Sequence, residues 1–222
     1  GGRRALQAAL VAAGALAMAA VGAGVASWLQ HSTSGATVTY KALPIGEADA
    51  VDSGGTSPDW LSTPGGARRA LEWTPDGQTL VFIGRRNGVQ QVYVRRLGAP
   101  AARAIPGTEG TQTLAVSPDG RSVTFWAGGE IKKVPLGGGA VTELASGSDL
   151  LAAPWVLAYD VEGRLFVGKA FGAICMVHVD GKTTPVTRVG EGELSHSLPW
   201  PVPRTRLVLY TVRKRVCSWG DE

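Results

Sequence analysis

The sequence predicts an all-β protein, part of a β-propeller, because one short phrase recurs at a fixed interval. Thr74-Pro-Asp-Gly77 returns as Ser117-Pro-Asp-Gly120, then in weaker forms as Asp160-Val-Glu-Gly163 and Val202-Pro-Arg-Thr205. The third positions of successive copies, Asp76, Asp119, Glu162 and Arg204, lie 43, 43 and 42 residues apart. Self-similarity at about 40–45 residues is typical of propeller blades.

A short apolar run follows each copy, as expected of a strand that begins after a turn. The runs are Leu80–Ile83, Val123–Trp126, Leu165–Val167 and Leu207–Tyr210. The predicted architecture is therefore about four WD-like blades of four-stranded antiparallel sheet within residues 65–222. We expect the blades at about residues 70–105, 114–144, 155–189 and 199–222, the last one incomplete.

The residue types of the phrase suit a tight turn between strands. Proline presets φ for the second position of the turn, aspartate bonds nearby backbone, and glycine takes the left-handed conformation. We therefore interpret the residues of the three better copies as structural turn formers, not as catalytic acids. They are Pro75, Asp76, Gly77, Pro118, Asp119, Gly120, Glu162 and Gly163.

The first residues predict a membrane segment. Arg3-Arg4 precede an apolar run from Ala5 to Leu29 that is long enough to cross a bilayer as a helix. No matching positive cluster follows Leu29, so residues 1–4 should be cytoplasmic. The alternative is a cleaved signal peptide, with small residues at Ala23–Ala26 before the cleavage site. Both interpretations place the remaining residues outside the cytoplasm.

Small residues recur every four positions along this helix, at Ala15, Ala19, Ala23 and Ser27. Such a face lets two helices approach closely, which would give a homodimer. The alternative, which we favour, is that the pattern arises by chance because alanine and glycine fill the helix.

Residues 30–64 are predicted to be a juxtamembrane linker. Within it, Thr37–Leu43 is either a strand that closes the ring or part of a decayed first blade.

No catalytic, cofactor or metal site is predicted. Asp49, Asp52 and Asp59 lie in a predicted loop, Pro44–Pro64, and lack the spacing of a calcium loop. The three histidines, His31, His178 and His196, share no zinc-ligand spacing, and we place His196 in a loop before the fourth blade. Ser195-His196 has no nucleophile-elbow setting.

The net charge bears on which partners the protein binds, and the cysteine spacing bears on whether a disulfide forms. The net charge of +4 and a charged fraction of 18% are too small to indicate nucleic-acid binding. Basic pairs such as Arg85-Arg86 and Arg95-Arg96 are interpreted as solvated edge charge, with a rim for an anionic ligand as the alternative. Cys175 and Cys217 lie 42 residues apart, about one blade, so we expect two free thiols.

The repeated Pro-Asp-Gly turns between short strands resemble the WD-like, TolB-type propellers of bacteria. Longer phrases are similar to the extracytoplasmic repeats of membrane-bound bacterial serine/threonine kinases. These phrases are Ile105-Pro-Gly-Thr-Glu-Gly110, Val116-Ser-Pro-Asp-Gly-Arg121, Ile131-Lys-Lys-Val-Pro-Leu-Gly-Gly-Gly139 and Gly192-Glu-Leu-Ser-His196. In that family a cytoplasmic kinase domain precedes one transmembrane helix, and the propeller follows it. The chain itself has no kinase motif.

The resemblance implies a non-catalytic sensor that binds a protein or small molecule on the propeller face and is anchored by a single membrane span. The alternatives are a TolB-like periplasmic scaffold without an attached enzyme and, less favoured, the propeller gate of an oligopeptidase. The 193 residues after Leu29 allow about four and a half blades, so we also expect the reading frame to continue past Glu222.

Overall fold

The structure is a computed structural model that describes residues 2, 42–52, 69–146, 154–169 and 171–214. The chain divides into two compact units, Gly1–Leu43 and Pro44–Glu222, and the strands lie in the second. The predicted helix Ala5–Leu29 falls outside the described residues, as do its small-residue face and Cys217. Within the described ranges, no helix is long and apolar enough to span a membrane.

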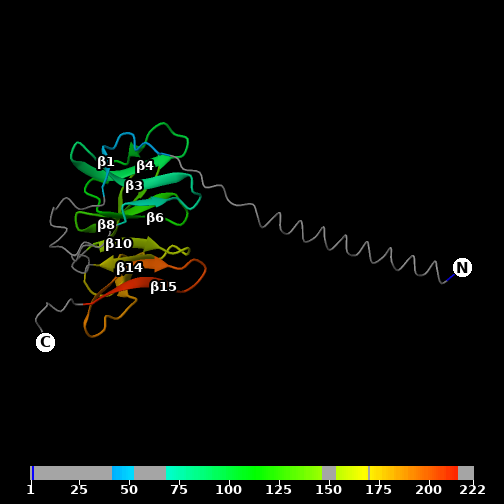
Figure 1. The fold of residues 1–222 in the computed structure, drawn as a ribbon. Coiled ribbons are helices and arrows are strands. Elements are labelled where there is room, and N and C mark those ends of the chain that lie inside the picture. Colours follow the sequence, from blue (N-terminus) through cyan, green and yellow to red (C-terminus); the bar gives the residue numbers. More distant parts are fainter. Residues whose placement is uncertain (1, 3–41, 53–68, 147–153, 170, 215–222) are drawn as a thin grey trace, which may run out of the picture. The chain divides into compact units, whose positions relative to one another are not determined.

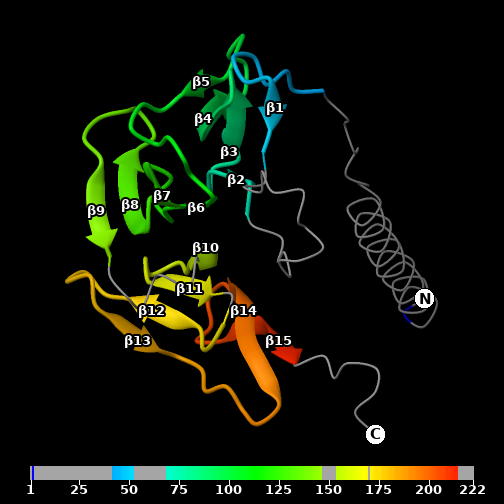
Figure 2. The same cartoon turned by 90° about the vertical axis from the view of Figure 1, so that its left-hand side faces the viewer.

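Four antiparallel sheets make up the second unit (Figures 1 and 2). The first contains β1 (Ala50–Val51), β2 (Leu71–Trp73), β3 (Thr79–Arg86), β4 (Val89–Arg96) and β5 (Arg103–Ala104). The second contains β6 (Thr113–Val116), β7 (Ser122–Ala127), β8 (Glu130–Pro135) and β9 (Thr142–Ala145). The third contains β10 (Pro154–Tyr159), β11 (Leu165–Lys169), β12 (Cys175–Val177) and β13 (Thr183–Pro185). The fourth contains β14 (Glu193–Pro201) and β15 (Val208–Lys214).

Strands in the second and third sheets pair in sequence order, which is the meander of a propeller blade. Tight hairpins join the middle strands, and their residues suit positive φ. Asn87 and Gly88 have φ of 50° and 80° between β3 and β4, and Gly128 and Gly129 have 65° and 86° between β7 and β8. Two successive left-handed residues are typical of the type I′ turn that matches strand twist. The predicted all-β class, with four-stranded antiparallel sheets that fit a partial propeller, is confirmed.

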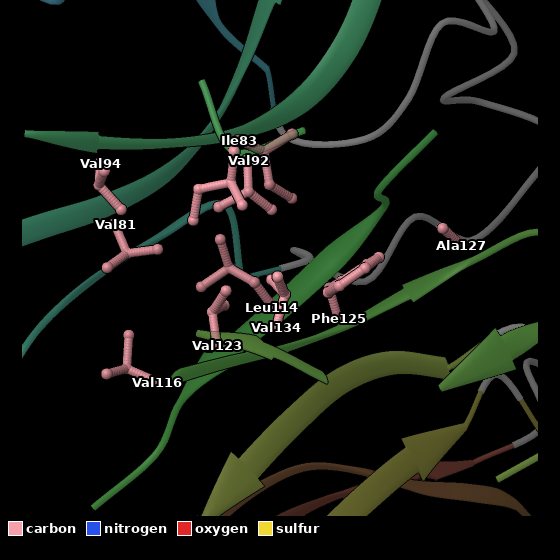
Figure 3. Packing of buried hydrophobic residues seen from close by; sticks show 11 residues of the cluster. Val81, Ile83, Val92, Val94, Leu114, Val116, Val123, Phe125, Ala127 and Val134 are labelled. Atoms are coloured by element: carbon pink, nitrogen blue, oxygen red, sulfur yellow. The ribbon is translucent and has the colours of Figure 1, made fainter. Parts of the chain in front are cut away.

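Neighbouring sheets pack face to face, and the central strands bury both of their faces. One set of β7 side chains, including Val123 and Phe125, meets Val81 and Ile83 of the first sheet (Figure 3). The opposite set includes Trp126, which packs with Leu157 of the third sheet. A strand that is covered on both sides needs apolar residues at nearly every position, which explains the run Val123–Trp126.

Polar contacts also join the inner strands of different sheets. The Glu72 carboxylate of β2 accepts the Val116 backbone N–H of β6 at 2.9 Å and the Arg69 Nη1 donor at 3.1 Å. The same Arg69 guanidinium lies 5.4 Å from the ring centroid of Trp200 in β14, within reach of a cation–π contact. Arg69 and Glu72 thus connect the first sheet to the second and the fourth.

Two stretches expected to be loops contain strands. Ala50–Val51, inside the predicted loop Pro44–Pro64, forms β1 and pairs with β3. The compact unit that contains the sheets begins at Pro44. Of the predicted strand Thr37–Leu43, Ala42 and Leu43 are described, and they are not in a strand.

The second is the stretch around His196, which the prediction placed in a loop before the fourth blade. It belongs to the long strand β14. A bulge between Ser197 and Trp200, with Leu198 at a φ of 53°, accommodates Pro199 within the strand. His196 is therefore 3% exposed and hydrogen-bonded through Nε2 to Glu193 Oε2 at 2.9 Å.

The structure contradicts the predicted exposure of some basic side chains and agrees with the predicted free thiol of Cys175. Arg95 was interpreted as solvated, but it is 6% exposed and donates through Nε to the Pro44 carbonyl at 3.2 Å. Arg85 and Arg86 pair with acids of residues 44–52. Cys175 is buried with a free thiol, as predicted, while the second thiol of that prediction belongs to the undescribed Cys217.

Candidate binding site between the second and third sheets

The turn between β2 and β3 is organised by a hydroxyl group. The Thr74 carbonyl accepts the Gly77 N–H at 2.8 Å, and Gly77 has a φ of 66°. Thr74 Oγ1 accepts the Thr79 N–H at 3.0 Å and donates to Asp76 Oδ1 at 2.6 Å. The same carboxylate oxygen accepts the Gln78 N–H at 3.0 Å. Asp76 therefore closes the turn from within.

The turn between β6 and β7 repeats this geometry with serine in place of threonine. Ser117 Oγ accepts the Ser122 N–H at 3.0 Å and donates to Asp119 Oδ1 at 2.5 Å. Asp119 Oδ1 also accepts the Arg121 N–H at 3.0 Å. The Ser117 hydroxyl, followed by this backbone donor, lowers the pKa of Asp119, and Thr74 and Gln78 do the same to the pKa of Asp76.

The third turn, between β10 and β11, is closed by a different residue. Asp160 Oδ1 accepts the Glu162 N–H at 3.0 Å and the Arg164 N–H at 2.9 Å, so Asp160 replaces the hydroxyl at the first position. Glu162, which the repeat aligns with Asp76, instead forms an ion pair with Arg164. Gly163 keeps the positive φ, at 84°. Alignment by spacing alone did not reveal the role of Asp160.

The fourth turn has no glycine, and its residue with positive φ lies at the third position instead of the fourth. Arg204 has a φ of 61° at the third position, where type II turns place positive φ. Thr205 Oγ1 accepts the Leu207 N–H at 3.1 Å, which supplies a side-chain acceptor from the fourth position. The turn still forms because the Val202 N–H donates to the Leu207 carbonyl at 2.9 Å.

A cavity of about 520 Å³ opens beside the second and third of these turns. Pro118 and Asp119 line it from one sheet, and Glu162 and Gly163 line it from the next. The first-turn residues Pro75, Asp76 and Gly77 are not among its lining residues, although Pro75 Cδ would lie 3.3 Å from a Cβ at Gly120. The structure thus brings Pro118 and Asp119 together with Glu162 and Gly163 of the next blade, while Gly120 is not among the lining residues.

The rest of the lining combines apolar and polar side chains. Leu144, Leu165, Val161, Val177 and Val179 supply the apolar surface. The polar groups come from Ser117, Lys133, Tyr159 and His178. We call this site, defined by these residues and the four turn residues above, the inter-sheet cleft. Apolar surface with a few polar groups is typical of binding sites for ligands and peptide side chains.

Tyr159 links the two walls of the inter-sheet cleft. Its hydroxyl lies 2.7 Å from Thr124 Oγ1 of β7, and burial raises the pKa of the phenol above its usual value. The side chain is therefore neutral at physiological pH and retains a proton to donate. The sequence held a signal for this residue, since Tyr159 occupies the position of Trp73 and Val116 directly before the repeated turn.

His178 and Val179 follow β12 and were missed as site residues. His178 Nε2 lies 2.9 Å from Thr184 Oγ1, and Val179 is fully exposed at the mouth of the inter-sheet cleft. Sequence alternation suggested only that His178 was a strand residue. Its place at the cleft depends on where the β12–β13 hairpin ends relative to the neighbouring sheet.

The histidine and serine of β14 do not form a hydrolytic site. Ser195 and His196 are consecutive strand residues, so their side chains point to opposite faces of the sheet. Among the described residues, Ser195 Oγ and His196 Nδ1 are buried without a hydrogen-bond partner, and the imidazole centroid lies 4.7 Å from the Tyr210 ring centroid. Across the described residues, no group of three or more His, Cys, Asp or Glu side chains could hold a metal ion.

No protein-family model matches the chain, and no curated protein matches it in sequence. A solved structure of a TolB-type protein from Agrobacterium tumefaciens matches with a TM-score of 0.56 and 18% identity. The match covers 65% of this chain and 54% of that one. The fold is that of a TolB-type propeller.

Two further structures are similar at lower TM-scores. TolB from Acinetobacter baumannii gives 0.44 at 19% identity, over 59% of this chain and 34% of that one. A gluconolactonase from Xanthomonas campestris gives 0.47 at 18% identity, over 59% and 48%. At such identities the likeness concerns the fold alone. The chain spans about half the length of the Agrobacterium TolB-type structure, and its sheets form part of a TolB-type propeller.

Proposed function

We propose that this chain is a non-catalytic protein-interaction module that binds its partner at the inter-sheet cleft. The observation that carries the proposal is the cleft itself, an open cavity at the turn-bearing side of a TolB-type propeller. Its apolar lining residues can bury an apolar side chain, and Tyr159 and Asp119 can bond the backbone or a donor group beside it. Propellers commonly use such blade-end surfaces as interaction platforms.

We further propose that the module is a sensor held at the bacterial inner (plasma) membrane by Ala5–Leu29, with the residues after Leu29 outside the cytoplasm. Its parent would be a receptor-type serine/threonine kinase. The support comes from the sequence, namely the arginine-flanked apolar run and the phrases similar to kinase-linked repeats. A TolB-like periplasmic scaffold with no attached enzyme is the second candidate, supported by the propeller fold.

Site-specific photocrosslinking in cells tests the interaction site. A photoreactive amino acid replaces Val161 or Val179, which line the inter-sheet cleft, or Val89, which is 46% exposed in the first sheet and serves as the control. We expect Val161 and Val179 to yield one shared protein adduct that the Val89 position does not yield. Absence of an adduct from both cleft positions, or an equal adduct from Val89, would exclude the cleft as the interaction site.

Two measurements separate the sensor kinase from the free scaffold. The native polypeptide is captured with an antibody to residues 69–214 and sequenced by mass spectrometry. Peptides containing His-Arg-Asp and Asp-Phe-Gly motifs support a kinase parent, and a native polypeptide without them supports the scaffold. If a kinase is present, deletion of residues 30–222 should abolish the response of its activity to the crosslinked partner. An unchanged response would contradict the sensor role.

A further inference from the structure

Residues Pro44–Asp52, here called the strap, lie along one edge of β3. β2 pairs only with Leu80–Phe82 of that edge, and β1 of the strap continues the ladder with Ala50 opposite Arg85 and Val51 opposite Gly84. Two further main-chain bonds hold the strap, from the Asp49 N–H to the Arg85 carbonyl at 2.8 Å and from the Asp52 N–H to the Ile83 carbonyl at 2.9 Å. The strap therefore binds as an added strand.

The first sheet has a surface shaped to receive the strap. Phe82 and Tyr93 stack at 5.6 Å on the side of the sheet opposite the Val81 and Ile83 side chains, and Ala48 is buried against this pair. A Cβ at Gly84 would lie 2.7 Å from Tyr93 Cδ2 and 2.9 Å from Ala48 Cβ. Glycine at this position thus leaves the space that the strap fills.

Charge on the strap is opposite to charge on the sheet. Asp52 Oδ2 accepts the Arg85 Nε donor at 2.7 Å, and Glu47 lies 3.6 Å from Arg86 Nη1. Asp49 Oδ2 accepts the backbone N–H of Asn87 at 3.1 Å, at the tip of the β3–β4 hairpin. All three acidic residues of the strap therefore meet donors from one strand and its turn.

The strap is not required to hold the blade strands together. β3 pairs along its whole length with β4 on the other edge, and β2 pairs with β3 independently of β1. β1 is only two residues long and is held by a few main-chain bonds and charge pairs, so it can leave the sheet edge more readily than a strand of the meander.

We propose that the edge of the first sheet at Gly84–Arg86, with the Phe82–Tyr93 pair beside it, is an interaction site for an extended acidic peptide. The strap occupies the surface in cis, and an acidic strand of a partner protein takes its place when the strap leaves. The partner strand would match the strap pattern, with a small residue over the aromatic pair and carboxylates opposite Arg85 and Arg86. Main-chain pairing supplies the binding and the charges supply selectivity, as in other strand-addition sites.

The test uses the full chain and a fluorescent synthetic peptide of residues 44–52. Asp49→Asn/Asp52→Asn should weaken the strap, and amide exchange at positions 49 and 52 should report its release. We expect this double variant to bind the peptide at least tenfold more tightly than the unaltered chain, in which the tethered strap competes at high effective concentration. Binding should weaken as salt rises from about 50 to 500 mM, because the exposed charge pairs are screened.

Two controls locate the binding. Arg85→Gln/Arg86→Gln in the released background should weaken peptide binding, whereas Arg121→Gln, on an exposed turn of the second sheet, should leave it unchanged. If the amides of positions 49 and 52 stay protected in the double variant, Asp52→Pro is used in its place. This change removes both the backbone N–H that bonds Ile83 and the carboxylate that bonds Arg85. Failure of a released strap variant to bind the peptide, or equal binding after the Arg85/Arg86 changes, would overturn the proposal.

Discussion

At the scale of single residues, the recurring turn depends on a side-chain oxygen that accepts backbone N–H groups, usually from the residue at its first position. Thr74 and Ser117 provide a hydroxyl that both accepts a backbone N–H and donates to the aspartate two residues later. Asp160 provides a carboxylate in the third copy, and the fourth copy uses Thr205 instead. One structural task is thus met by different chemical groups, provided that an oxygen lies close to the same backbone donors.

Removal of the Ser117 hydroxyl should destabilise the protein. Ser117→Ala leaves the buried Ser122 N–H without its acceptor, and an unsatisfied buried donor costs about 1–3 kcal/mol. Ser117→Thr, which copies Thr74, is the matched control and should stay close to the unaltered chain. Urea unfolding of both variants measures the free energy of unfolding. Equal stability of Ser117→Ala and Ser117→Thr would show that the hydroxyl is not needed.

The turn carboxylates should contribute to the acid sensitivity of the fold. The pKa values of Asp76 and Asp119 are lowered in the folded protein, so the unfolded chain binds more protons as the pH falls. Their contribution is complete above the unfolded pKa of about 3.8 and is lost as the pH falls through the lower folded pKa. Urea titrations at pH 6 and pH 3 should show a smaller loss of stability for Asp76→Asn/Asp119→Asn than for the unaltered chain. An identical loss would contradict this assignment.

At the scale of elements, β7 shows how a blade joins its neighbours. Val123 and Phe125 face the first sheet, while Trp126 and Thr124 face the third, where Thr124 bonds Tyr159. Alternate side chains of one strand therefore take part in two interfaces. The inter-sheet cleft lies on the Tyr159 side of this strand, so its walls are positioned by the same packing that stabilises the blades.

Truncation within this element should be far more costly than truncation at the surface. Phe125 is fully buried, and Phe125→Ala should lower the free energy of unfolding by about 3–5 kcal/mol through lost burial and a residual cavity. Val89→Ala, at a side chain that is 46% exposed, should change it by less than about 0.5 kcal/mol. Chemical unfolding curves compare the two. A similar effect of both changes would mean that the interface between the first two sheets is not formed.

At the scale of the whole molecule, contacts remote in sequence join the sheets. Arg69 reaches Trp200 of the fourth sheet and Glu72 reaches Val116 of the second, while the strap reaches back onto β3 from residues 44–52. The first sheet is thus covered by the second sheet on one face and by the strap on the other.

The proposed anchor leads to a prediction at this scale. Deletion of residues 5–29 should move the chain from the membrane fraction to the soluble fraction, because the apolar run supplies the bilayer-spanning length. A reporter enzyme that is active only outside the cytoplasm, fused after Glu222, should be active in the unaltered chain. Persistence of the deleted chain in membranes after alkaline washing would contradict the anchor. A silent reporter would contradict the proposed orientation.

The sequence by itself determined the blade period, the turn positions and the strand-rich class, because these depend on local backbone preferences and on alternation along one strand. Spacing predicted that Asp119 and Glu162 occupy turns. Only the tertiary structure showed that these residues meet across two sheets, that His196 is buried in a bulged strand, and that residues 44–52 form an added strand. Those outcomes depend on which surfaces remain to be covered once the sheets have packed, and no local pattern carries that information.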